Sequence, residues 1–121
     1  AEGYSAAVIG DLNMGPESSA GNYRYMGTRG YDDAVLPFAD AVGCTWDPTS
    51  PLNNLQVFAA CPPQRIDHLF LKRGGKLKAS SAEKVFTDAS VAAGPKKVPK
   101  MVPLSDHYGL VITLQSDAEH I

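Results

Sequence analysis

Three short acidic segments, spread over most of the chain, carry side chains that could do chemistry together. They are residues 10–13, 65–68 and 105–107, and each lies at the edge of an apolar run. Folding could therefore bring three carboxylates, an amide and an imidazole to one rim. The candidate residues are Asp11, Asn13, Asp67, Asp106 and His107. Such a set is suited to metal-assisted hydrolysis of a phosphodiester.

That reaction places specific demands on side chains. It needs a cation to neutralise nonbridging oxygens, a base to position or deprotonate water, and donors for the charge that develops in the transition state. Magnesium prefers oxygen ligands and keeps several waters, so scattered carboxylates and an amide suit it better than a tight His and Cys cluster. The five candidates meet these demands as a group.

Each acidic segment also has an ordinary structural interpretation. Asp11 and Asn13 are two apart on an expected extended segment, so both can point to the same side; the alternative is an Asx-rich turn after a strand. Asp106 and His107 are either site residues or polar residues that end a loop before a buried strand.

The histidines and Arg65 could have either chemical or structural roles. His107 could act as a base if a neighbour held its tautomer, and Asp67 could accept from its ring nitrogen if their strands are neighbours. We expect Arg65 to make a structural salt bridge or to cover the sheet edge. His68 is as well explained as a packed aromatic as it is as a ligand.

The elements that must position these residues are mainly strands. Apolar runs predict strands at residues 6–9, 66–72 and 108–114. Pro16 and Glu17 could open a helix through Tyr25 or Met26. The coarse order predicts one sheet with a helix against a face.

The rest of the chain is predicted with less regular structure. Residues 46–54 are dominated by turn-forming residues, which predicts an ordered loop. Residues 76–88 could hold another strand around residues 85–87, on a weak signal. Residues 92–103 carry three Lys and three Pro and are typical of an exposed connection.

Composition limits the architecture and the partners. The 121 residues, 44% hydrophobic, suffice for one domain of modest core. A formal net charge of -2 gives no general argument for binding nucleic acid or an acidic membrane. The two cysteines, Cys44 and Cys61, lack the spacing of a zinc site. Two buried or half-buried thiols are expected, with a single disulfide as the alternative.

Taken together and in this order, the three segments resemble the endonuclease/exonuclease/phosphatase superfamily, which has the DNase I-like fold, and the resemblance extends from about Ala6 to Leu114. Within it, the segments look most like neutral sphingomyelinases. The residues that carry this second likeness are Gly10-Asp11-Leu12-Asn13-Met14 with Pro16-Glu17, Thr45-Trp46-Asp47 with Asn53, and Pro103-Leu104-Ser105-Asp106-His107.

The resemblance implies a role for each candidate. Asp11 would orient or activate the attacking water, and Asn13 would hydrogen-bond the scissile phosphate. His107 would contact the phosphate and act in acid-base chemistry, with Asp67 fixing its ring. Asp106 would bind the metal region, Mg²⁺ or Mn²⁺, directly or through water, and Asp11 would also face the metal.

The resemblance also implies that the fold is shared with another segment. Residues 1–121 correspond to the carboxyl-terminal half of a four-layer α/β (α+β) sandwich, a mostly antiparallel sheet with a flanking helix. The family's amino-terminal half supplies the Glu that holds magnesium. Half of such a fold would leave an apolar sheet face and a sheet edge uncovered. We therefore expect a companion chain or segment that supplies the other half.

The leading expectation is a magnesium-dependent phosphodiesterase, sphingomyelinase-like, that acts on a lipid substrate and contacts a membrane surface. A nuclease or a phosphoinositide phosphatase on the same fold is the alternative within the enzyme class, because fold does not choose substrate. Nucleic acid is the less favoured substrate, since the basic signal is weak. A catalytically inactive structural or binding subunit derived from this fold is the alternative from another class.

Overall fold

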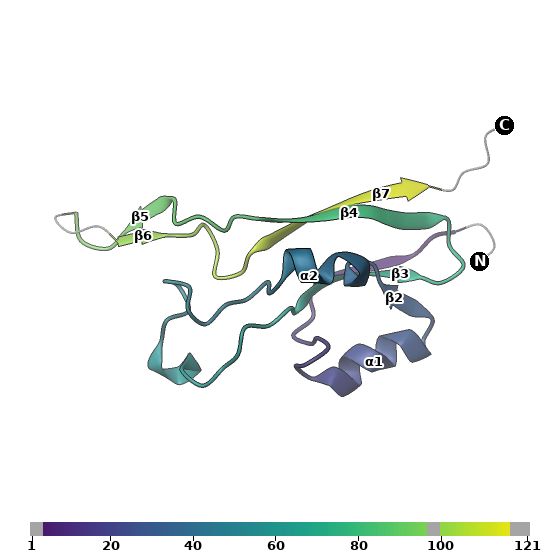
Figure 1. Ribbon diagram of the computed structural model, residues 1–121, viewed down its shortest axis with the longest axis horizontal. Coiled ribbons are helices and arrows are strands. Elements are labelled where there is room, and N and C mark those ends of the chain that lie inside the picture. The colour runs from purple at the N-terminus through teal and green to yellow at the C-terminus, as the bar shows by residue number, and fades with distance from the viewer. Residues whose placement is uncertain (1–3, 97–99, 117–121) are drawn as a thin grey trace.

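The computed structural model describes residues 4–96 and 100–116, and it is a mixed α+β fold in which every strand pair is antiparallel (Figure 1). Short 3₁₀ helices cover Leu36–Phe38 and Gln56–Phe58. The strands and α-helices are β1 (Ala7–Asp11), α1 (Ala20–Thr28), β2 (Tyr31–Asp33), α2 (Ala39–Val42), β3 (Asp67–Lys72), β4 (Leu77–Val85), β5 (Val91–Ala93), β6 (Lys100–Val102) and β7 (Gly109–Ser116).

The central sheet has the order β1-β3-β2, and β3 is its buried middle strand. Four successive residues of β3 are buried, because an apolar run can be covered on both faces. Leu69, Phe70 and Leu71 of this run form the core with Val35 and Val42. The predicted strands at residues 6–9 and 66–72 are therefore confirmed.

Helix α1 begins later than the sequence indicates. Residues 15–18 form a turn in which the Gly15 amide donates to the Ser18 carbonyl, and Ser19 is left-handed with φ 51°. The helix therefore starts at Ala20 and not near Pro16. It contacts the sheet mainly through Tyr23, whose ring packs against those of His68 and Phe70.

The expectation of a single sheet is wrong. Strands β4 and β7 form a separate two-stranded ribbon, and β5 and β6 form a third small sheet that continues it at one end in Figure 1. The strand at residues 108–114 is confirmed as β7. The weak strand lies earlier than expected, at Leu77–Val85.

The exposed connection expected at residues 92–103 is also wrong in part. Residues 91–93 pair with residues 100–102, although all three residues of β5 are exposed. The Pro and Lys residues of this segment are typical of loops, so its local sequence does not predict the strand pairing. Residues 97–99 lie outside the described part of the chain.

Apolar side chains remain exposed on strands that have a free edge. Ile9 on β1 is 74% exposed and Val111 on β7 is 51% exposed. Within the described residues, β1 pairs only with β3 and β7 pairs only with β4. Neither α-helix described has the length and apolar character needed to cross a membrane.

Gly15 is needed where the turn before α1 meets the segment that leads into β3. A Cβ on Gly15 would overlap the carbonyl oxygen of Arg65. We expect Gly15→Ala to lower the free energy of unfolding by about 1–3 kcal/mol, because backbone must shift to make room. Gly27→Ala is the matched control: a Cβ there meets open space on α1, so a gain of about 0.5–1 kcal/mol is expected. Urea denaturation measures both, and equal effects would contradict this packing.

Candidate active site

Asp11, Asp67 and His107 meet at one end of the central sheet. Asp11 and Asp67 are directly opposite in the β1–β3 register, so their side chains project from the same face. His107 Nδ1 lies 2.8 Å from Asp67 Oδ2, and His107 Nε2 lies 3.7 Å from Asp11 Oδ2. One ligand atom from each of the three residues lies within 4.8 Å of the other two. The expected pairing of His107 with Asp67 is therefore present.

The contact between Asp67 and His107 was expected to come from neighbouring strands, but β3 and β7 are not neighbours in a sheet. Trp46 makes antiparallel bridges to Gln64 on one side and to His107 on the other. The segments before β3 and β7 are thus joined through the loop that contains Trp46. Asp67 and His107 are each 22% exposed at the side chain, so the pair is open to ligands on one side.

The pKa of His107 is set by burial of the ring and by the carboxylates around it. Partial burial of the ring would lower the pKa of His107, but the hydrogen bond to Asp67 and the charges of Asp67, Asp11 and Asp106 raise it, and the net pKa is raised. Since a carboxylate oxygen only accepts, Nδ1–H donates to Asp67. Nε2 is left on the side of Asp11. An imidazolium here offsets the repulsion of two carboxylates that face each other across a strand pair.

The raised pKa of His107 has a consequence for stability. Because the folded-state pKa lies above the unfolded value of about 6.5, the stabilisation is fully present below about pH 6.5 and is lost as pH rises through the folded-state pKa. His107→Asn retains a donor for Asp67 but does not titrate. We expect wild type to exceed this variant in free energy of unfolding by more at about pH 5.5 than at about pH 8.5. Urea denaturation tests this, and a pH-independent difference would contradict it.

Asn13 is not on an extended segment with Asp11, so that expectation is wrong. Its backbone is left-handed with φ 50°, and its N–H donates to Asp11 Oδ1 at 3.0 Å. This is the Asx turn that was the alternative interpretation. The turn holds the Asp11 carboxylate while Oδ2 faces His107. Asn13 itself is exposed beside it.

Asp106 is adjacent to the site without joining the three converging side chains. Its carbonyl accepts from Asn53 Nδ2 at 2.7 Å, and its exposed carboxylate lies 3.5 Å from Ser105 Oγ. The charge of Asp106 is near enough to help raise the pKa of His107. A role for Asp106 in binding metal stays a prediction.

Arg65 and His68 have structural roles. Arg65 Nη1 lies 2.8 Å from Asp33 Oδ2, with the two side chains 8% and 3% exposed. Tyr23 Oη donates to the same Asp33 oxygen at 2.6 Å. The structural salt bridge expected of Arg65 is confirmed, and its partner could not be found from the sequence because Asp33 lies in a mixed segment without a clear pattern.

His68 is buried within this network as a packed aromatic. Nε2 lies 2.5 Å from the Met14 carbonyl, and Nδ1 lies 3.3 Å from Arg65 Nη1. A carbonyl accepts and a guanidinium donates, so His68 is the neutral Nε2–H tautomer. Burial is the main cause that lowers the pKa of His68, which agrees with a neutral ring. His68 is therefore not available as a ligand.

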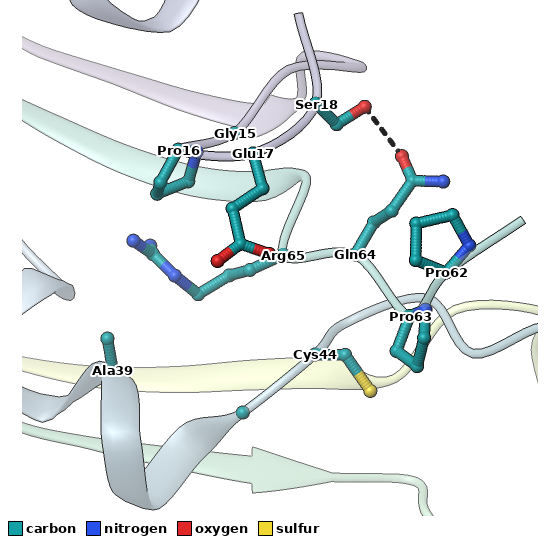
Figure 2. A pocket seen from close by; sticks show the side chains of 11 residues that line it. Gly15, Pro16, Glu17, Ser18, Ala39, Cys44, Pro62, Pro63, Gln64 and Arg65 are labelled. Carbon is teal, nitrogen blue, oxygen red and sulfur yellow. Dashed lines mark hydrogen bonds between the residues drawn. The ribbon is translucent and has the colours of Figure 1, made fainter. Parts of the chain in front are cut away.

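A cavity of about 300 Å³ lies beside Arg65 but is separate from the candidate site. Figure 2 shows it between the turn at residues 15–18, the segment at residues 62–65 and the end of α2, with the Ser18–Gln64 hydrogen bond at its edge. None of Asp11, Asp67 and His107 lines it. Cys44 lines it as a half-buried free thiol, and Cys61 is also free, as expected.

Comparisons of the chain with protein-family models, with curated proteins and with solved structures found no match. Two carboxylates and one imidazole, with one carboxylate bonded to the imidazole, form an acid-base pair next to a second acid. Carboxylate oxygens at a partly exposed rim are also donors of the kind that a divalent cation uses.

Proposed function

We propose that this chain is the carboxyl-terminal part of a magnesium-dependent phosphodiesterase with the DNase I-like fold, and that it acts as a sphingomyelinase-like phospholipase C. The observation that supports the proposal is the hydrogen bond of 2.8 Å between His107 and Asp67, with Asp11 facing the same imidazole. The three segments that carry the resemblance thus supply side chains to one place.

The roles follow from the contacts of each residue. Asp67 holds the Nδ1–H tautomer of His107, which directs Nε2 away from Asp67. The raised pKa of His107 favours the imidazolium, whose Nε2–H can donate a proton to a phosphate oxygen. Asp11, partly exposed and held by the Asx turn, accepts a proton from the attacking water. Exposed Asn13 offers its amide to the scissile phosphate.

The donor set is compatible with a divalent cation. Two carboxylates at one rim supply the hard oxygen donors that Mg²⁺ or Mn²⁺ prefers. Asp11 and Asp106 would hold the metal, which when bound neutralises charge on the phosphate oxygens.

The proposal includes a companion segment, either elsewhere in a longer chain or in a separate subunit. Ile9 is highly exposed and is two residues from Asp11 on the same face of β1, so the uncovered apolar surface leads to the site. A segment packed on this face would complete both the core and the ligand set. Without it, we expect the isolated chain to show no turnover.

The test is hydrolysis by the complete assembly with Mg²⁺, assayed in parallel on sphingomyelin vesicles, a phosphoinositide and DNA. We expect release of phosphocholine from sphingomyelin, its loss on chelation of the metal, and its recovery when Mg²⁺ is restored. Turnover of DNA or phosphoinositide alone would keep the phosphodiesterase and reject the lipid substrate. Failure on all three, in an assembly that binds Mg²⁺, would favour an inactive structural or binding subunit.

A further inference from the structure

The two members of the His107–Asp67 pair belong to different sheets. Asp67 is the first residue of β3, and His107 lies two residues before β7. Within the described residues, β3 pairs with β1 and β2, whereas β7 pairs with β4 alone. The separation of 2.8 Å is therefore not set by strand pairing between them. The Trp46 bridges join the two segments through their backbones, and side chains of the same loop add further contacts.

Thr45 contacts the backbone on both sides of the pair. Its hydroxyl Oγ1 lies 3.1 Å from the Ile66 N–H nitrogen and 3.2 Å from that of Asp67, and accepts from both. Its carbonyl accepts from the Tyr108 N–H at 2.7 Å. Thr45 is fully buried, so water does not compete for these bonds. One residue thus ties Asp67 to the residue that follows His107.

Asn53 holds the same segment from its other end. Its side-chain amide donates to the Asp106 carbonyl at 2.7 Å and to the Asp47 carbonyl at 3.0 Å. Asn53 is only 2% exposed. The Asp106 carbonyl belongs to the peptide that leads into His107, so this bond fixes the plane from which the imidazole extends.

We propose that Thr45 and Asn53 are positioning residues that hold the His107 imidazole against Asp67 from the loop between them. A polar side chain this deeply buried costs stability when its partner is lost, so the fold is held to the geometry in which each bond is made. The catalytic consequence rests on the proposed function, but the positioning does not. It concerns only the bond between His107 and Asp67.

The test uses the full chain with ¹⁵N-labelled histidine, at a pH where the imidazole is neutral. Wild type is expected to show His107 as the Nδ1–H tautomer with a slowly exchanging Nδ1 proton, assigned by its loss in His107→Ala. Thr45→Val removes the acceptor while keeping the shape, and Asn53→Ala removes the donor. Both are expected to lose that proton signal and to give a mixture of tautomers.

Two matched variants separate positioning from general disturbance of the loop. Thr45→Ser retains the hydroxyl and is expected to restore the wild-type signal. Ser50→Ala removes a buried hydroxyl of the same loop that has no partner among the described residues, and no change in His107 is expected. In an active assembly, Thr45→Val and Asn53→Ala should lower kcat by about 10- to 100-fold with little change in KM.

Wild-type tautomer and proton signal in folded Thr45→Val and Asn53→Ala would overturn the proposal. If neither variant folds, exchange of the Ile66 and Asp67 amides in wild type decides: protection supports the bonds to the Thr45 hydroxyl, and exchange at the rate of an unstructured chain overturns the proposal. Altered His107 signals in an assembly that hydrolyses none of the substrates would support the positioning and reject the proposed function.

Discussion

His107→Ala is expected to lower turnover by the complete, magnesium-loaded assembly by about 10²- to 10⁴-fold, the usual contribution of a positioned acid or base. The physical reason is that His107 is the only imidazole in the described residues that is both partly exposed and bonded to a carboxylate. The measurement is kcat for release of phosphocholine. Turnover at the wild-type level would contradict the roles given to His107 and Asp67.

Folding must be shown to survive this substitution. The imidazole is partly open to water, so its loss should cost about 1–2 kcal/mol, well below the total stability of a domain of this size. His107→Asn is the matched variant because it can still donate to Asp67 but cannot carry a proton near neutral pH. We expect it to be folded and as inactive as His107→Ala.

Arg65→Met is expected to lower the free energy of unfolding by about 3–5 kcal/mol, the largest stability effect that we anticipate. The substitution leaves the Asp33 carboxylate charged, buried and without its cation, and it removes the donor to His68 Nδ1. Urea denaturation followed by circular dichroism measures the loss. The turn before α1 and the start of β3 should become disordered together.

The chain contains a matched exposed pair. Arg73 Nη2 lies 2.6 Å from Asp32 Oδ1, one residue from Asp33, but these side chains are 59% and 60% exposed. Arg73→Met should therefore cost far less stability than Arg65→Met. Similar losses for the two substitutions would mean that burial of the Arg65–Asp33 pair is not what makes it important.

Local pattern predicted the elements that are apolar and continuous. The strands β1, β3 and β7 were found because each contains an unbroken apolar run, and their ends place Asp11, Asp67 and His107. The expected position of strand β4 differed from the observed one because Ser80, Ser81 and the lysines of the strand obscure the alternation of apolar and polar residues. Its register, with an irregularity between Ala79 and Ser81, depends on pairing with β7 about 30 residues away.

Long-range polar contacts could not be predicted from spacing. Asp33 and Tyr23 gave no signal, yet together with Arg65 they form the buried network under α1. Thr45 and Asn53 were noticed only through a loop resemblance, without a role, because their partners are backbone groups of distant segments. The pairing of His107 with Asp67 was expected, but the path that connects them was not.

The pairing of Asp11 with Asp67 makes the site sensitive to the length of one strand. Side chains along β1 alternate between faces, so inserting or deleting one residue between Ala7 and Asp11 would turn the Asp11 carboxylate to the opposite side of the sheet. Length changes in exposed turns between β1 and β3, outside β2 and the loop that carries Thr45 and Asn53, carry no such penalty. Homologous sequences that keep this chemistry should therefore vary in length at those turns, and keep a constant count through β1.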